Sequence, residues 1–204
     1  MAVASLSKFT VPLANNQSAD SQGLLMPKLQ YRFRANFVNF GISNQTNELT
    51  KQVVDIKRPN VTFTPVVLDV YNSKVYLQGK PEWQETTINL RDDATGAVSK
   101  LVGEQVQKQF DFMEQASAAA GINYKFQLTY EMLDGGNGTV APTVLEAWEL
   151  DGCFLSAADY GDMNYNSSDP VMIALTIKFD NAIQTIGGSV GTTVVTQTPG
   201  TSIN

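Results

Sequence analysis

The segment INYKFQLTYEM, residues 122–132, decides the fold class of this chain. Its apolar residues alternate one for one with polar residues; the apolar series is Ile122, Tyr124, Phe126, Leu128, Tyr130 and Met132. Successive side chains of a β-strand point to opposite faces of the sheet, so this period predicts a strand with one buried and one wet face. The chain is therefore expected to build its core on a β-sheet.

The same period recurs on both sides of this segment. The other predicted strands are residues 29–37, 52–57, 61–70, 74–78, 83–90, 144–150 and 171–179. The pair Asn72-Ser73 tolerates turn geometry and predicts a hairpin, in which Pro65 is confined to an edge or a bulge. Residues 41–47 are expected to be a polar loop, and the glycine-rich residues 134–138 a turn between antiparallel strands.

A change to helical spacing marks residues 94–120. The apolar stripe consists of Val98, Leu101, Val102, Val106, Phe110 and Met113, at steps of three and four. Asp92 and Asp93 are placed to accept hydrogen bonds from the first helical N–H groups, and Gly121 is placed to end the helix. The stripe, Phe110 included, is expected to pack on the sheet.

These elements predict one α+β domain, mainly antiparallel β: a small β-barrel or sandwich with one long flanking amphipathic helix. The domain is expected to span residues 27–182. Residues 1–26 lack a sustained period and are interpreted as an N-terminal arm, and residues 183–204 as a C-terminal tail that is flexible or docked on a partner.

The amino-acid composition excludes several classes of function. The chain has 204 residues, of which 43% are hydrophobic and 17% charged, with one cysteine and no histidine. The missing histidines exclude Ser-His-Asp, Cys-His and imidazole-metal chemistry, and one cysteine excludes a multi-thiolate zinc site. The net charge of −6 argues against a protein that grips phosphate backbones. No apolar stretch is long enough for a membrane span, so a chain folded in a cytoplasm, without membrane insertion, is expected.

Each candidate catalytic or ligand-binding site has a simpler structural explanation. Residues 135–138 lack the following helix that a phosphate-binding loop needs. The acidic loop 159–169 misses the spacing of a calcium loop, and Asp92 with Asp93 is explained by helix capping. The aromatic residues Trp83, Tyr124, Tyr130 and Trp148 suggest a sugar-stacking platform, but at strand spacing they are typical of a core. We therefore expect no catalytic residue, cofactor or metal, and no enzyme.

Four segments carry a resemblance to a known family. They are YNSKVYLQGKPEW (71–83), TTINLRDD (86–93), VQKQFDF (106–112) and AWELDGCF (147–154), the last followed by a loop and a final strand. In this order they resemble the tail tube protein of contractile-tailed bacteriophages, over about residues 27–182. The resemblance rests on the order and pattern of elements.

The resemblance implies subunits that close into hexameric rings, which stack into a tube that conducts DNA during ejection. It implies a place in the virion tail, after assembly in the host cytoplasm. The implied partners are further copies of the chain, the tail sheath, the baseplate or tube initiator, and the tail terminator. DNA would pass without specific binding, and an acidic wall suits that role because it repels phosphates.

The hairpin around Asn72 is the predicted subunit interface, because its apolar surface exceeds what an isolated ribbon keeps in water. The predicted interface residues are Val66, Leu68, Val70, Tyr71, Asn72, Ser73, Val75 and Tyr76, with Arg32 and Arg34 on the polar face of the first strand. The planar guanidinium group of arginine can donate two hydrogen bonds to a carboxylate of a partner.

Two other interpretations stay open on the sequence. A tube subunit of a bacterial secretion or phage-like injection system would share the pattern. A carbohydrate-binding β-sandwich would use exposed aromatic residues instead.

Overall fold

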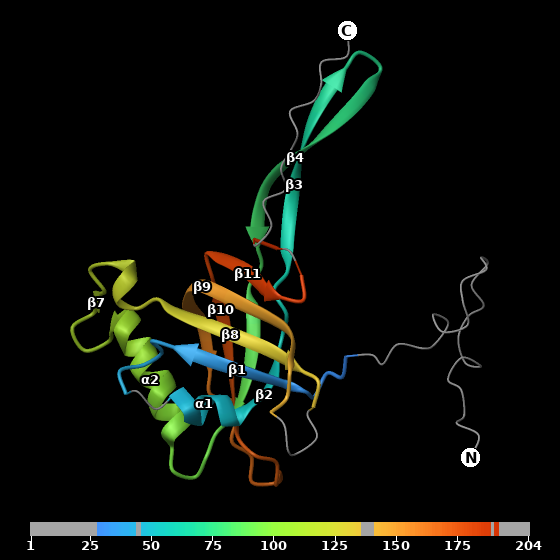
Figure 1. Cartoon of the computed structure of the whole chain (residues 1–204). Coiled ribbons are helices and arrows are strands. Elements are labelled where there is room, and N and C mark those ends of the chain that lie inside the picture. Colours follow the sequence, from blue (N-terminus) through green and yellow to red (C-terminus); the bar gives the residue numbers. More distant parts are fainter. Residues whose placement is uncertain (1–27, 44–45, 136–140, 189, 192–204) are drawn as a thin grey trace, which may run out of the picture.

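The computed structural model describes residues 28–43, 46–135, 141–188 and 190–191. The predicted arm and most of the predicted tail lie outside these residues, as does most of the turn at 134–138. In chain order the elements are β1 (Phe33–Val38), α1 (Thr46–Gln52), β2 (Val53–Ile56), β3 (Val61–Val70), β4 (Ser73–Trp83), β5 (Thr86–Arg91), α2 (Ala97–Gln109), β6 (Phe110–Asp111), β7 (Ala116–Ser117), the 3-10 helix η3 (Gly121–Asn123), β8 (Phe126–Leu133), β9 (Val144–Asp159), β10 (Met172–Lys178) and β11 (Asn181–Ile186) (Figure 1).

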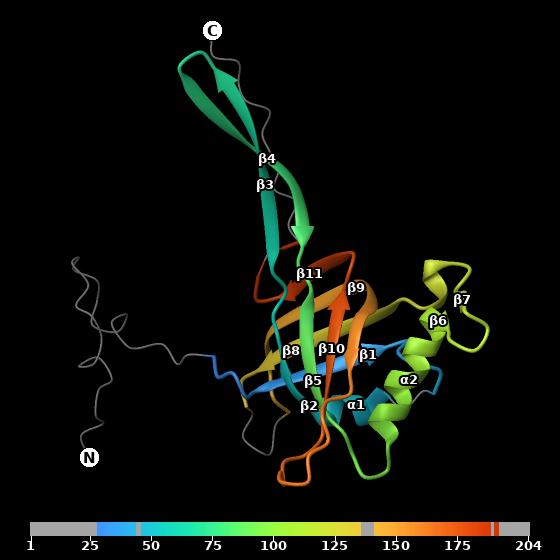
Figure 2. The ribbon, with the colours of Figure 1, turned by 180° about the vertical axis from the view of Figure 1, so that it is seen from behind.

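A body and a projecting ribbon make up the described chain (Figures 1 and 2). The body is one antiparallel sheet with the order β1-β8-β9-β10-β5-β2, in which β11 also pairs with β9. The ribbon is the two-stranded sheet β3-β4. The prediction of a mainly antiparallel α+β fold is confirmed. The predicted closed barrel is not, because no pairing joins β1 to β2 among the described residues.

The long strand β9 joins the two halves of the sheet. Its first part, up to Cys153, pairs with β8, and Phe154–Asp159 pairs with β10. Between them Gly152 has φ 66°, and a Cβ there would lie 2.2 Å from the Asp180 carboxylate. Glycine tolerates this left-handed backbone and close approach, so the strand bends without ending. Residues 152–154, which follow the predicted strand 144–150, therefore continue the same strand.

Both halves bury their inner faces in one core. The core includes Ile88 and Leu90 of β5, Leu128 of β8, and Leu175 of β10, all fully buried. In β8 every second residue is buried, as the alternation predicts. The strand begins at Phe126, however, because the preceding residues form η3 and a turn.

The helix α2 is shorter than predicted. Val98, Leu101 and Val102 are buried, but the helix ends at Gln109 and Phe110 has extended backbone. The carboxylate of Asp111 accepts hydrogen bonds from the backbone N–H groups of Met113 and Glu114, at 2.9 and 3.3 Å. Such local bonding competes with helix continuation. Phe110 and Met113 thus leave the stripe, and Met113 is 91% exposed.

One of the two predicted capping residues, Asp93, caps the start of α2, whereas Asp92 accepts the backbone N–H of Asp93 at 3.0 Å. Asp93 Oδ1 accepts the backbone N–H of Ala97 at 2.9 Å. Hydrogen bonds from the Thr95 hydroxyl and from the backbone of Val98 and Ala97 lower the pKa of Asp93. Gly121 does not end the helix; it begins η3.

The sequence predicted neither α1 nor β11, nor the short elements β6, β7 and η3. The helix α1 begins in the predicted loop 41–47 and ends at Gln52, where a strand was expected, and it buries Leu49 in the core. The strand β11 crosses the predicted domain boundary at residue 182, and Ala182 is buried beside β9. Among the described helices, none combines the length and the apolar character that crossing a membrane requires.

Polar side chains of α2 fasten the helix to the body. Gln105 is fully buried; it accepts the N–H of Gly41 at 3.0 Å and donates to the carbonyl of Tyr124 at 2.7 Å. Glu104 accepts the backbone N–H groups of Ser43 and Ile42, at 2.9 and 3.0 Å. These hydrogen bonds lower the pKa of Glu104 below its ordinary value of 4.5.

Acidification is therefore expected to destabilise the fold in part through Glu104. A carboxyl whose pKa is lowered by folding contributes stability above its unfolded-state pKa, and this contribution is lost as the pH falls through the folded-state pKa. The free energy of unfolding should fall below a pH of about 4.5. Urea titrations over a pH series should show a shallower fall for Glu104→Gln than for the wild type; equal slopes would contradict this role.

Candidate assembly surface

The ribbon β3–β4 projects from the body and exposes apolar side chains along its length (Figure 1). β-Branched and aromatic residues favour its extended backbone. The turn consists of Tyr71 and Asn72, and the Ser73 hydroxyl donates to the carbonyl of Val70 at 3.1 Å. All eight predicted hairpin interface residues therefore lie together on the outer part of this ribbon.

The pairing register divides the ribbon into two faces. Val66 is opposite Leu77, Leu68 is opposite Val75, and Val70 is opposite Ser73. Directly opposed residues point to the same side, and neighbours along a strand point to opposite sides. One face is thus aliphatic, with Val66, Leu68, Val70, Val75 and Leu77; we call it the aliphatic face.

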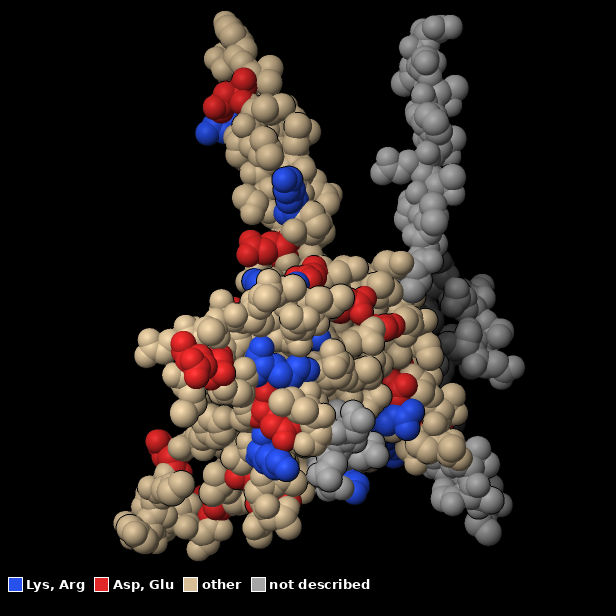
Figure 3. Space-filling model, turned by 90° about the vertical axis from the view of Figure 1, so that its left-hand side faces the viewer, with Lys and Arg blue, Asp and Glu red and all other residues tan. Residues whose placement is uncertain are grey.

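The other face of the ribbon is mixed. It carries Val67 opposite Tyr76, and Asp69 opposite Lys74, whose charged groups are 3.8 Å apart. Figure 3 shows few charged side chains on the ribbon, whereas acidic and basic side chains intermingle on the body below it. The ribbon therefore offers apolar contact on both faces and stays largely uncharged.

Tyr71, at the tip of the ribbon, has an unusual backbone conformation. Its φ is 48°, in the left-handed region, and its side chain is fully exposed. An aromatic residue pays a steric cost there that glycine or asparagine avoids. No contact within the described residues explains why a tyrosine occupies this position, and its role at a subunit interface stays a prediction.

The base of the ribbon contains an irregularity that the sequence predicted in part. The register shifts between Phe63 and Pro65, so Pro65 lies beside a bulge, as expected. At this bulge a Cβ on Gly79 would come 2.0 Å from the Thr64 carbonyl oxygen, so only glycine fits. β4 consequently runs through Gly79 and Pro81 to Trp83, longer than the predicted arm of 74–78.

Arg32 and Arg34 lie on the body, not on the ribbon. Arg34 pairs with Glu131 of β8, and Arg32 donates to the carbonyl of Asp134 at 2.5 Å. Both are thus engaged within their own chain, and their role at an interface stays a prediction.

Three of the four aromatic residues considered as a sugar-stacking platform pack in or against the core, as expected. Trp83 and Trp148 pack against the core, and the Trp83 ring lies 5.8 Å from that of Phe179. Tyr130 is buried in the core. These aromatic residues serve packing, as their strand spacing indicated.

Other exposed apolar residues were missed. Phe112 and Ile122 lie in the segment between α2 and β8, and Met163 and Tyr165 lie on the loop before β10. Ile122 belongs to the periodic series of the predicted strand 122–132, but it lies in η3. The other three lie in loops, which carry no period. Among the described residues no cluster of His, Cys, Asp or Glu could hold a metal ion.

Comparison with known proteins places the fold. No family model matches the chain, and no curated protein matches it. A chain in the cryo-EM structure of the anti-feeding prophage baseplate is 12% identical with a TM-score of 0.57, over 80% of this chain and 99% of that one. A chain in the tube terminating cap of the anti-feeding prophage is 11% identical with a TM-score of 0.59, over 84% and 99%.

A third similar chain comes from the sheath-tube complex of the PVC extracellular contractile injection system, in its extended state. It is 12% identical with a TM-score of 0.56, over 83% of this chain and 99% of that one. At such identities the likeness shows the fold. The fold is that of components of phage-like tube assemblies, as the resemblance to tail tube proteins implied.

Proposed function

We propose that this chain is the structural subunit of the tube in a phage-like contractile tail or injection apparatus, built by self-association into stacked rings. The ribbon β3–β4 is the observation that carries the proposal. Its aliphatic face and Tyr71 have no partner surface on the described body, from which the ribbon projects (Figure 1). The shared fold supports the same role.

The energetics of the ribbon favour a partner. A two-stranded ribbon is marginally stable alone, and exposed apolar patches of this kind mark protein interfaces. The sheet itself has further edges to cover, because β1 and β2 end the described strand order. Such edges promote pairing with another chain, and closing them between subunits of a ring removes the hazard.

The finer proposal is a tail tube of hexameric rings in a virion, assembled in the host cytoplasm, that conducts DNA during ejection. Sheath, tube initiator or baseplate, and terminator are its proposed partners. The net charge of −6 supports a conduit that does not hold DNA. An injection-system tube is the alternative, and the similar chains from the anti-feeding prophage and PVC favour it.

A structural role also fits the chemistry of the described residues. The pKa of Cys153, the single thiol, is raised by burial to about 12, which keeps it protonated and unreactive. Glu146 is held by Lys28 at 2.6 Å and by the Trp148 indole at 2.8 Å. Burial alone would raise the pKa of Glu146, but these hydrogen bonds and the charge of Arg58 outweigh it and lower the pKa.

Sedimentation velocity of the full chain over a rising concentration series tests the proposal. The expected result is a shift from the 22.2 kDa monomer to much larger species. A monomer at every concentration, with and without added tube initiator, would overturn it.

A further inference from the structure

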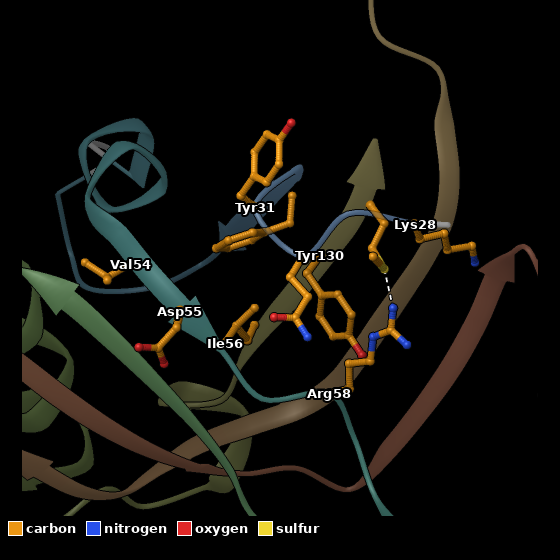
Figure 4. A pocket seen from close by; sticks show the side chains of 10 residues that line it. Lys28, Tyr31, Val54, Asp55, Ile56, Arg58 and Tyr130 are labelled. Atoms are coloured by element: carbon orange, nitrogen blue, oxygen red, sulfur yellow. Dashed lines mark hydrogen bonds between the residues drawn. The ribbon is translucent and has the colours of Figure 1, made fainter. Parts of the chain in front are cut away.

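A groove opens between β1 and β2, the two ends of the strand order (Figure 4). Its volume is about 800 Å³, room for several side chains. Val54, Asp55 and Ile56 of β2 all line it. Because consecutive side chains of a strand point to opposite faces, the groove runs along the edge of β2 and not over one face.

The remaining lining combines apolar and polar side chains. Tyr31 precedes β1, Phe33 begins it, and Met132 lies on β8. Gln30, Lys28 and Arg58 add polar groups, and the side chains of the last two are 42% and 55% exposed. The helix α1, which links β1 to β2, buries Leu49 in the core. The groove is therefore a place where the sheet is not closed by the described chain.

Tyr130 lines this groove, and its hydroxyl points toward the side chain of Arg58 (Figure 4). Tyr130 is 2% exposed, and its hydroxyl has no hydrogen-bond partner among the described residues. Burial raises the pKa of Tyr130 far above the usual tyrosine value, so the hydroxyl keeps its proton. A buried polar group is rarely left without a partner. We therefore expect a carbonyl or hydroxyl of an incoming segment to reach it when the side chain of Arg58, 55% exposed, moves aside.

We infer that this groove receives the tip and aliphatic face of the β3–β4 ribbon of a second copy. The inference rests on the proposed function and names the surface that the ribbon contacts. A ribbon laid between β1 and β2 brings backbone N–H and C=O groups to two strand edges that lack a described neighbour. It also brings an acceptor to the Tyr130 hydroxyl.

The chemistry of the two surfaces matches. The aliphatic face meets the apolar lining, and the mixed face stays toward the rim. There Lys28 and Arg58 share one carboxylate, that of Glu146, at 2.6 and 3.6 Å, which leaves a net positive charge opposite Asp69. Asp55, which accepts hydrogen bonds from the Asn89 amide, is the acidic counterpart of Lys74. Complementary charges at a rim fix register more than they add affinity.

The occupant is a second copy because the ribbon cannot reach its own groove. It leaves the body, and its tip lies far from β1 and β2 in both views (Figures 1 and 2). A contact between two different surfaces of one chain is heterologous and repeats from copy to copy. Such a contact stacks subunits in a row.

Disulfide cross-linking tests the contact directly. In Val70→Cys/Val54→Cys, one cysteine lies near the ribbon tip and the other in the groove; both positions are partly exposed, and the native Cys153 is buried. Mild oxidation should give a ladder of cross-linked multimers on a non-reducing gel. Val70→Cys/Val171→Cys, which moves the second cysteine to an equally exposed valine outside the groove, should give no ladder beyond the Val70→Cys dimer.

Tyr130→Phe provides a second readout. The variant removes a hydroxyl that has no described partner in the monomer, so the monomer's stability should not fall. In the assembly it removes a hydrogen bond, so the concentration needed for assembly should rise about three- to tenfold. A less stable monomer with unchanged assembly would assign the hydroxyl a partner within its own chain and overturn the inference.

The outcomes separate the inference from the proposed function. Assembled particles without a Val70-Val54 ladder would overturn the groove contact and leave the tube proposal standing. If Tyr130→Phe weakens assembly but no ladder forms, another segment fills the groove, which also overturns the inference. A chain that stays monomeric under all conditions overturns both.

Discussion

Tyr71→Ser/Tyr76→Ser is expected to abolish assembly while leaving the body's fold unchanged. Tyr71 is fully exposed and Tyr76 is 65% exposed, so neither supports the core. Aromatic residues dominate interface energetics, and losing one from an interface centre costs about 2 kcal/mol or more. If the two losses add, the concentration needed for assembly should rise about a thousandfold.

Circular dichroism and sedimentation of this double variant check the prediction. Tyr165→Ser is the matched control, since Tyr165 is an exposed tyrosine on the loop before β10. Normal assembly of the double variant would place the ribbon on an outer surface. Loss of the monomer's fold would place the two tyrosines in a core.

Leu101→Ala is expected to cost about 2–5 kcal/mol of unfolding free energy, because it leaves a cavity under α2. Leu101 is 1% exposed in the core cluster. Phe110→Ala should cost less than Leu101→Ala, although the sequence stripe treats the two positions alike. Phe110 is half-buried after the end of the helix and contacts Phe112, with ring centroids 5.1 Å apart.

Denaturant unfolding of the two variants should be compared in the monomeric Tyr71→Ser/Tyr76→Ser background, so that assembly does not add to the measured stability. A larger loss for Phe110→Ala than for Leu101→Ala would mean that the helix continues beyond Gln109, as the sequence predicts. A loss below about 1 kcal/mol for Leu101→Ala would contradict its burial.

Sequence periodicity predicted β8 and β10 because one face of each strand is buried. The alternation in β8 and β10 is present in both sequence and burial. The prediction failed where the deciding contacts are far apart in sequence. Gly152 bends β9 around Asp180, and the Gln105 side chain bridges Gly41 and Tyr124, so neither feature has a local pattern.

The two candidate surfaces differ in how far sequence could find them. The ribbon was predicted because its apolar residues are too many for a hairpin in water, a property of one local segment. The groove combines Tyr31, Val54 and Tyr130, which lie on three separate elements. Tyr130 also resembles an ordinary core residue in sequence, and the missing partner of its hydroxyl is visible in the fold.

Electron microscopy of the concentrated full chain tests the central claim of self-assembly most directly. The account predicts end-on views of rings with a central channel and side views of stacked rings, which disappear in Tyr71→Ser/Tyr76→Ser and persist in Tyr165→Ser. Fields of separate particles of monomer size, under conditions where the chain is folded, would contradict it.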